Sequence, residues 1–248
     1  MKFDVLTLFP EMFSSFLGES MIKNAIDGGI VQVELVNVRD FATDRHRTAD
    51  DYPFGGGPGM VMKPEPVFLA AESVLKDRER GVVPVVLLSP QGRKLDQRVA
   101  CELADRPEIM LLCGHYKGVD ERIRLDLATD EISLGDVVVT GGELAAMVII
   151  DAVTRLLPGV LGDFASAESD SFYKGLLEHA NYTKPRDFRG HRVPEVLLGG
   201  NHDAIRVWRR RDSLKRTLLR RPDLLAAAEI TDEDKRLLED IKADLNLN

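Results

Sequence analysis

The stretch "VVVTGGELAAMVIID", residues 137–151, places a glycine pair between a β-branched run and an apolar run. This is the outline of a phosphate-binding loop, in which a helix N-terminus donates N–H groups to an anion. However, the letters match neither nucleotide fingerprint, GxGxxG or GxxxxGK(S/T), and Glu143 would repel a phosphate from the first helical turn. Two interpretations stay open: a turn that only lets strand and helix pack closely, and a wall for a neutral or cationic ligand.

Two more glycine-containing polar stretches follow apolar runs, "LLSPQGRKLDQ" at 87–97 and "LLCGHYKGVDER" at 111–122. In open α/β sheets, ligands bind outside the carboxyl ends of the strands. The loops after Leu88, Cys113 and Val139 are therefore expected to meet at one crevice. Taken singly, the glycines would only shape turns, and His115 would be an ordinary loop histidine.

A third candidate is the polar loop "RDFATDRHRTADDYPFGGGPGM", residues 39–60, which is rich in charge and then in glycine. Long loops of this kind are usually functional or disordered. Its members Asp44, His46, Asp50 and Asp51 are types that bind metals, but they follow no recognised ligand spacing. A loop held together by salt bridges is the favoured interpretation.

The elements that would position these loops follow an alternating strand and helix pattern over the first 157 residues, which predicts an α/β domain around a mostly parallel sheet. Alternating runs at 2–8 and 30–38 and apolar runs at 82–88, 108–113 and 136–140 predict strands. A helix is expected from Phe13 to the glycines at 28–29, and another from about Glu143 to Leu157, before Pro158.

A change in composition after Pro158 indicates a domain boundary. The segment "GVLGDFASAESDSFYKG" is rich in small residues, and helical spacing returns beyond it, with "TDED" as the cap of a last helix. We expect a catalytic α/β domain over 1–160, a flexible linker over 161–172 and a small, mainly α-helical domain over 173–248.

The charge of the chain is unevenly distributed. The net charge is −8, yet residues 184–221 hold twelve Lys or Arg against four Asp or Glu. Such a block is either a solvated helix face or an anion-binding surface, and the tryptophan in "RVWRRRDSLKRTLLRR" favours nucleic acid.

The two cysteines, Cys101 and Cys113, form no CxxC pair, and no apolar run is long enough to span a bilayer. We expect a cytoplasmic protein without a membrane partner.

Nine motifs in order then resemble one family: "LFPEMF", "DRHRTADD", "FGGGPGM", "LSPQGRKLDQ", "CGHYKGVDERI", "GDVVVTGGELAAM", "SDSF", "YTKPRDFRG" and "GNHDAIRVWRR". They are similar to the bacterial tRNA (guanine-N1)-methyltransferases of the TrmD type, in the SPOUT class. The resemblance implies an α/β domain with a deep trefoil knot that binds S-adenosyl-L-methionine. It also implies methyl transfer to N1 of guanosine at tRNA position 37, next to the anticodon, by a homodimer with its active site at the interface.

The resemblance further implies three groups of site residues. His46, Asp50 and Gly59 fall on the loop associated with guanine recognition, and His202 and Arg209 fall on the tRNA-contacting domain. The residues that would surround the methyl donor are Ser89, Pro90, Gly114, Tyr116, Gly118, Leu134, Gly135, Asp136, Val137, Val138, Val139, Gly141 and Gly142.

Asp170 and Arg155 are the catalytic residues that the resemblance implies. Asp170 would be the general base that removes the N1 proton, and Arg155 would orient the guanine and stabilise its developing charge. Without the resemblance, Asp170 would be interpreted as the N-cap of a helix over 171–180, and Arg155 as the partner of Asp151 in an i,i+4 pair.

One position departs from the family pattern. Many members have glutamate after the tyrosine, where this chain has Lys117. Mg²⁺ is therefore kept only as a candidate cofactor, with no metal ligands assigned. Two other functions stay open on the residues alone: a non-catalytic RNA-binding protein with an α/β scaffold, and a nucleotide-dependent enzyme that uses the glycine turn.

Overall fold

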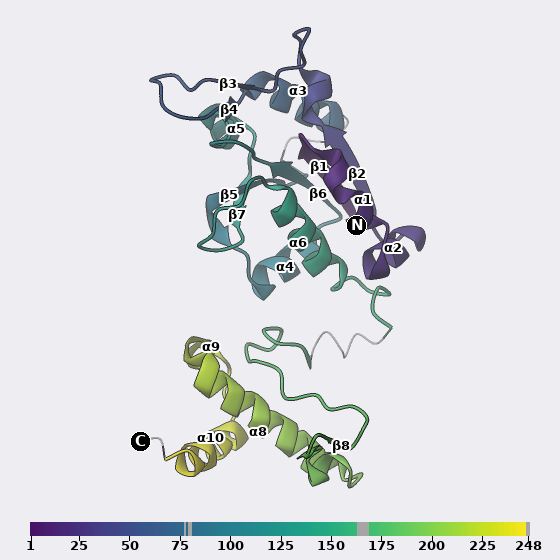
Figure 1. Ribbon diagram of the computed structural model, residues 1–248, viewed down its shortest axis with the longest axis vertical. Helices are drawn as coiled ribbons and strands as arrows, with labels where there is room; N and C mark the ends of the chain where they lie inside the picture. The colour runs from purple at the N-terminus through teal and green to yellow at the C-terminus, as the bar shows by residue number, and fades with distance from the viewer. Residues whose placement is uncertain (77, 79–80, 163–168, 247–248) are drawn as a thin grey trace. The chain divides into compact units, whose positions relative to one another are not determined.

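The computed structural model describes residues 1–76, 78, 81–162 and 169–246. The chain divides into two compact units, Met1–Phe164 and Ala165–Asn248 (Figure 1). None of the helices in the described ranges is long and apolar enough to cross a membrane.

A five-stranded parallel sheet with the order β2-β1-β6-β5-β7 forms the centre of the first unit. Three of its strands lie within predicted runs, and β5 begins in the run 82–88 but continues to Lys94. It starts directly after Pro84, whose ring nitrogen has no hydrogen to donate to the ladder. The strands are β1 Lys2–Thr7, β2 Gln32–Asn37, β5 Val85–Lys94, β6 Glu108–Cys113 and β7 Asp130–Ser133. The expected α/β fold around a parallel sheet is confirmed.

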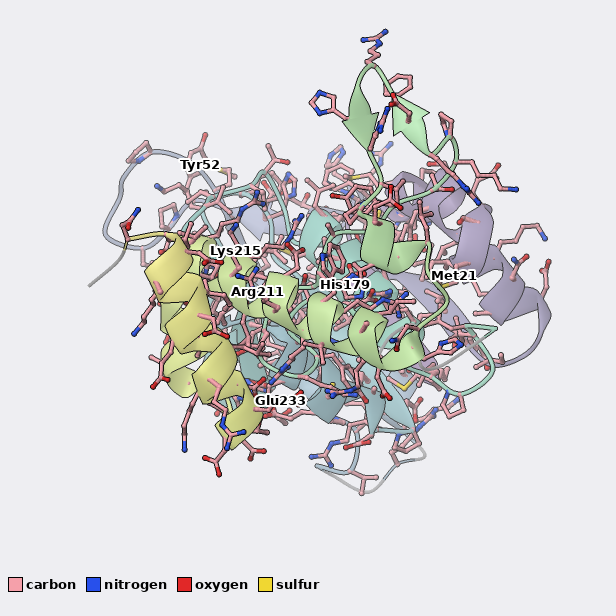
Figure 2. All side chains as sticks on the ribbon, turned by 90° about the horizontal axis from the view of Figure 1, so that it is seen from below. Met21, Tyr52, His179, Arg211, Lys215 and Glu233 are labelled. Carbon is pink, nitrogen blue, oxygen red and sulfur yellow. The ribbon has the colours of Figure 1, made fainter. Side chains whose placement is uncertain are left out.

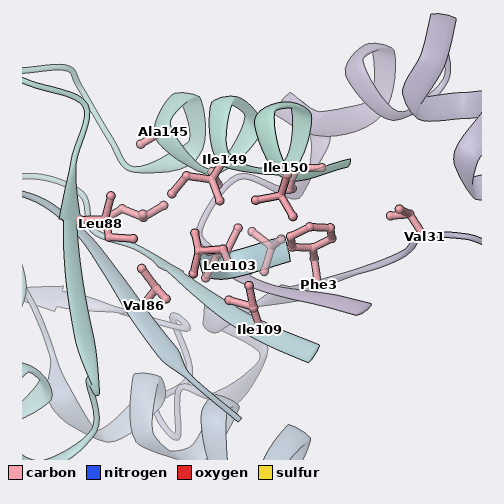
Figure 3. Packing of buried hydrophobic residues seen from close by; sticks show 14 of the residues in the cluster. Phe3, Val31, Val86, Leu88, Leu103, Ile109, Ala145, Ile149 and Ile150 are labelled. Atoms are coloured by element: carbon pink, nitrogen blue, oxygen red, sulfur yellow. The ribbon is translucent and has the colours of Figure 1, made fainter. Parts of the chain in front are cut away.

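Both faces of the sheet are covered by helices. Figure 3 shows one face, where Phe3 of β1 and Ile109 of β6 pack under Ile149 and Ile150 of α6, Glu143–Thr154. Helices α2 (Ser20–Asp27) and α4 (Gln97–Ala104) contribute to the same layer. Helices α3 (Pro64–Leu75) and α5 (Glu121–Asp126) cover the other face. Each fully buried large aliphatic or aromatic side chain contributes about 1.5–3 kcal/mol to the free energy of unfolding. The two helical layers therefore hold the sheet in place, and with it the strand ends from which the loops leave.

Short elements complete the first unit. They are η1 Pro10–Phe13, α1 Ser14–Leu17, η2 Val38–Phe41 and the antiparallel pair β3 Asp50–Asp51 and β4 Val61–Met62. The single helix expected from Phe13 is broken at Gly18, which ends α1 by donating its N–H to the carbonyl of Ser14 at 3.2 Å.

The strand expected at 136–140 is wrong, because these residues form a loop without regular structure. Val137, Val138 and Val139 are 56%, 83% and 39% exposed, so their β-branched run is no buried strand. The fifth place in the sheet belongs instead to β7, a four-residue strand in which Ile132 and Ser133 are buried. Helix α6 also ends at Thr154, earlier than expected.

The second unit contains the helices α8 His202–Arg220, α9 Pro222–Ala227 and α10 Asp232–Asp244. A hairpin of β8 (Asp187–Phe188) and β9 (His191–Arg192) and the turn η3 (Glu195–Leu197) precede them. Leu176, Leu214 and Ile241 form its buried core. Much of the linker expected over 161–172 lies outside the described residues, since 163–168 are not among them.

Helix α10 begins with a reciprocal cap that also joins it to α8. Thr231 and Asp234 form a capping box, and the carboxylate of Asp234 accepts two hydrogen bonds from Arg210 of α8, at 2.6 and 2.8 Å. Asp234 is 1% exposed. The hydrogen bonds from Arg210 hold the pKa of the Asp234 carboxyl well below its usual range, against the opposing effect of burial.

We expect Asp234→Asn to lower the free energy needed to open the contact between α8 and α10 by about 2–3 kcal/mol, because the Arg210 guanidinium loses its buried anion. A folded-state pKa below the unfolded value stabilises the protein at pH above about 4, and this contribution is lost as pH falls below that value. Hydrogen exchange of the α8 and α10 amides at pH 7 in the full chain measures the effect. Asp232→Asn, in the same helical turn but with an 85% exposed side chain, is the matched control. Equal protection in the two variants would contradict the assignment.

Candidate functional site

A cavity of about 330 Å³ lies at the carboxyl ends of β5, β6 and β7. Three segments form most of its lining: residues 87–91 of β5, residues 114–119 after β6, and residues from 132 to 142 at and after the end of β7. Glu121 and Arg124 of α5 and Ala145 of α6 complete it. The three loops named from the sequence therefore meet at one crevice, although the third follows β7. The expected donor-site residues that line the cavity are Ser89, Pro90, Gly114, Tyr116, Gly118, Leu134, Val137, Val138, Val139, Gly141 and Gly142.

Gly135 and Asp136, the other two expected donor-site residues, belong to the loop after β7 but do not line the cavity.

The wall of the cavity formed by residues 87–91 arises from an interruption in the β5–β7 ladder. Leu88 and Arg93 both pair with Ile132, so the residues between them bulge out of the strand. This bulge turns Ser89, Pro90 and Gln91 toward the cavity.

The glycine pair brings the third wall against the end of β6. Gly142 donates its N–H to the carbonyl of Gly114 at 2.7 Å, and a Cβ on Gly142 would lie 2.7 Å from the Cα of Cys113. A Cβ on Gly141 would lie 2.4 Å from Nδ1 of His115. No side chain fits at either position, so the pair is required for close packing as well as for the shape of the cavity.

Glu143 does not face the ligand space. Its side chain is buried at 1% exposure, and its Oε1 accepts a hydrogen bond from the Thr7 hydroxyl at 2.7 Å. Burial, with the charge of Glu143 as a smaller cause, raises the pKa of the Cys113 thiol well above its usual value, so Cys113 is an inert core residue. The negative charge of the turn therefore lies behind the cavity wall.

The lining combines an apolar body with a few polar groups. Val119, Ile132 and Ala145 supply apolar surface, while Gln91 Oε1 accepts a hydrogen bond from Arg124 at 2.6 Å. The Tyr116 hydroxyl accepts one from Arg39 at 3.1 Å. Such a lining suits a ligand with a flat apolar part and a polar end.

The cavity also has polar and charged lining residues that were not among the expected donor-site residues: Gln91, His115, Lys117, Glu121, Arg124, Ser133 and Thr140. Gln91, His115 and Lys117 lie within motifs already singled out, so their sequence position was the available signal. Arg124 follows those motifs, on α5, and no pattern marks it.

The loop 39–60 reaches the cavity through Gly59. A Cβ on Gly59 would lie 2.5 Å from Cγ of Lys117, and the Lys117 N–H donates to the carbonyl of Met60 at 3.0 Å. Asp50 pairs with Met62, which in turn forms a bridge with Val119 of the cavity wall. Of the three expected guanine-loop residues, Gly59 and Asp50 are thus joined to the cavity by backbone, whereas His46 is exposed farther along the loop.

Hydrogen bonds and an ion pair within the loop itself support the salt-bridged interpretation. Asp44 accepts from the hydroxyl and the N–H of Thr48, both at 2.9 Å, and the Thr48 hydroxyl is the main cause that lowers the pKa of Asp44. Arg47 pairs with Asp40 at 2.9 Å. No group of three or more His, Cys, Asp or Glu residues able to hold a metal occurs in the described ranges.

Arg155, one of the two expected catalytic residues, lies in the first unit but does not line its cavity. Arg155 caps the C-terminus of α6, whereas the cavity lies at the N-terminus of that helix. Twelve residues of α-helix span about 18 Å. Asp170 belongs to the second unit, and residues 171–174 after it form a turn, so the expected helix over 171–180 is wrong and with it the interpretation of Asp170 as its N-cap.

On α8, ion pairs neutralise part of the basic block. Figure 2 shows Arg211 and Lys215 on α8 and Glu233 on α10. Five arginines have acidic partners: Arg206 with Glu233, Arg210 with Asp234, Arg211 with Asp244, Arg216 with Asp212 and Arg221 with Asp223.

A second set of basic side chains on α8 keeps its charge available. Arg209 is exposed and, among the described residues, neither it nor Lys215 nor Arg220 has an ion-pair partner. His202 is exposed in the first turn. Trp208, which precedes Arg209 in the chain, has its ring centroid 6.4 Å from that of His179 and 6.3 Å from that of Tyr182. Unpaired cations next to aromatic rings are typical of a nucleic-acid surface.

Comparison with known proteins agrees with this geometry. The family model described as tRNA (Guanine-1)-methyltransferase TrmD matches residues 1–227. A Moorella thermoacetica protein is 60% identical over 241 residues, which are 97% of this chain and 96% of that protein. A Dehalococcoides mccartyi protein is 56% identical over 246 residues, 99% of both chains, and an Anoxybacillus flavithermus protein is 57% identical over 242 residues, 98% of both. All three carry the name tRNA (guanine-N(1)-)-methyltransferase. This chain therefore belongs to the tRNA (guanine-1)-methyltransferase TrmD family.

Proposed function

We propose that this protein transfers a methyl group from S-adenosyl-L-methionine to N1 of guanosine at position 37 of tRNA. The observation that carries the proposal is the family match over residues 1–227, which includes every segment of the cavity wall. We place this activity in the cytoplasm, where tRNA is modified.

The cavity is proposed as the donor site. S-adenosyl-L-methionine offers an adenosine, a sulfonium cation and a polar methionine end, and it has no phosphate. The apolar wall formed by Val119, Ile132 and Ala145 suits the adenine, and the absence of a phosphate fingerprint at the glycine pair is consistent with this donor. The expected donor residues of the three cavity segments, with Gly135 and Asp136, would then surround it.

We also propose that the SPOUT trefoil knot forms around this cavity. Its support is the return of the chain after β7: the Gly142 N–H bonds the carbonyl of Gly114, beyond the end of β6, before α6 begins. Because protein chains are in general unknotted, the family match is the main argument for the knot.

Methylation of guanine N1 requires a general base. Guanine N1 carries a proton and is a poor nucleophile until that proton leaves. In the proposed reaction Asp170 accepts this proton, the N1 lone pair attacks the methyl carbon, and the carbon–sulfur bond breaks to leave a neutral thioether. Arg155 would stabilise the negative charge that develops on the guanine as the proton departs.

We propose a homodimer because of the position of Arg155. Arg155 lies about 18 Å from the cavity along the helix of its own first unit, so a partner subunit is the natural source of catalytic groups for each cavity. We propose that each donor cavity works with Asp170 of the partner chain. Residues 1–160 would then be the catalytic domain, 161–172 the linker and 173–248 the tRNA-binding domain.

Replacing Asp170 with Asn should lower the single-turnover methylation rate by roughly 10²–10⁴, because the base is lost while the donor cavity is untouched. The affinity for S-adenosyl-L-methionine, measured by calorimetry, should stay within a factor of two of wild type. Asp240→Asn, an exposed Asp on α10, is the matched control and should keep the wild-type rate. An unaltered rate in Asp170→Asn would refute the role of base.

Mixing two inactive variants tests the shared site. Gly141→Val blocks the cavity wall and Asp170→Asn removes the base, so each homodimer should be inactive. Randomly mixed chains should recover about a quarter of the wild-type sites, because half of the dimers are mixed and each mixed dimer has one intact pair. The readout is methylation after unfolding and refolding the two chains together. Absence of recovery, with mixed dimers shown by mass spectrometry, would contradict a site built from two chains.

The unpaired cations on α8 are proposed to bind tRNA phosphates. Arg209→Gln should raise KM for tRNA and reduce the slope of log affinity against log salt by about 0.7–0.9, as expected for one lost phosphate contact. Donor affinity should not change. Arg206→Gln removes the same charge from a residue already paired with Glu233, so it should change the slope less. Equal slopes for wild type and Arg209→Gln would argue against this contact.

A further inference from the structure

Glu143 joins three elements behind the donor cavity. Its Oε1 accepts from the Thr7 hydroxyl at the end of β1, and Thr7 Oγ1 accepts from the N–H of Phe9 at 2.9 Å. Its Oε2 lies 3.8 Å from Nδ1 of His115, after β6. The carboxylate is therefore held between the carboxyl ends of two strands and the first turn of α6.

The same carboxylate lies one backbone layer behind the cavity. A Cβ on Gly141, which lines the cavity, would lie 2.2 Å from Oε2 of Glu143. Adding one Cα–Cβ bond and a van der Waals contact, a ligand atom that touches Gly141 is on the order of 7 Å from this oxygen.

No lysine or arginine among the described residues pairs with this carboxylate. Among the described residues, no Lys or Arg lies within ion-pair distance of Glu143, and His115 is the single basic side chain near it. The His115 ring is packed against Phe9, with centroids 4.8 Å apart, and against Tyr116, 4.9 Å apart. The field of a buried charge in such surroundings extends into the cavity with less screening than it would have in water.

We propose that Glu143 is a specificity residue whose buried negative charge makes the cavity prefer the cationic sulfonium donor to its neutral thioether product. The inference rests on the proposed function, since it concerns the same cavity. Once the methyl group has left, the product no longer has the positive charge that Glu143 attracts, so its release is favoured over that of unreacted donor.

The test separates the charge of Glu143 from its hydrogen bond. Glu143→Gln removes the charge and keeps an oxygen that accepts from Thr7, whereas Thr7→Val removes the hydrogen bond and keeps the charge. Calorimetry on the full-length protein gives the Kd of S-adenosyl-L-methionine and of S-adenosyl-L-homocysteine for each variant. The readout is the ratio of the two Kd values, which a purely structural role would not change because both ligands share the adenosine and methionine parts.

Glu143→Gln should reduce the preference for the cationic donor by about 3- to 50-fold, the range for unit charges roughly 7 Å apart at effective dielectric constants between about 80 and 20. Thr7→Val should weaken both ligands alike and leave the ratio at its wild-type value. An unchanged ratio in Glu143→Gln, or the same change of ratio in Thr7→Val, would overturn the inference.

A double variant guards against misfolding of Glu143→Gln. Thr7→Val with Glu143→Met replaces both hydrogen-bonding partners by apolar groups of similar shape, a change that is often close to neutral for stability. It should show the same loss of preference as Glu143→Gln, and a wild-type ratio would contradict the inference. If the wild-type protein bound neither ligand, the proposed function itself would fail. If it bound both, but substitution at position 143 left the ratio of the two Kd values unchanged, only the inference about Glu143 would fail.

Discussion

The close approach of Gly141 and Gly142 to the end of β6 is the constraint on which the donor cavity depends. Because a Cβ at either position would overlap Cys113, His115 or Glu143, only glycine lets the chain pass here. That passage sets where the third wall runs, where α6 begins and where the first carboxylate of α6 is buried. The hydrogen bond from Thr7 to Glu143 then ties the end of β1 to the same point. A change at the glycine pair would therefore disturb the cavity, the start of α6 and the buried charge together.

The second unit presents positive charge, although the protein as a whole is acidic. Acidic side chains of α10 pair with Arg206, Arg210 and Arg211, and these pairs fix how α8 lies on its neighbour. The remaining cations, such as Arg209, lie on the same helix as Trp208. Part of the basic block therefore forms structural ion pairs, and the binding of tRNA by the remaining cations stays a prediction.

The sequence predicted the parallel sheet because its buried strands are short continuous apolar runs, as in "EIMLLC" of β6. The strand predicted at 136–140 was wrong because an apolar β-branched run can also form a loop, as Val137, Val138 and Val139 do. The strand β7 has the half-polar sequence "DEIS" in place of an apolar run. The convergence of three loops at one crevice could be predicted from the rule for strand ends. The inward turn of Glu143 toward Thr7 could not, because the two residues are 136 positions apart and no local pattern links them.

Methylation of two tRNA transcripts that differ only at position 37 tests the central claim most directly. Purified protein and S-adenosyl-L-methionine labelled in the methyl group should modify the transcript with guanosine at that position, and the label should be found on N1. The transcript with adenosine there should remain unlabelled, and a parallel reaction with a chelator would show whether the reaction needs a divalent cation. Equal labelling of both transcripts would contradict the proposed specificity, and labelling of neither would contradict the proposed function.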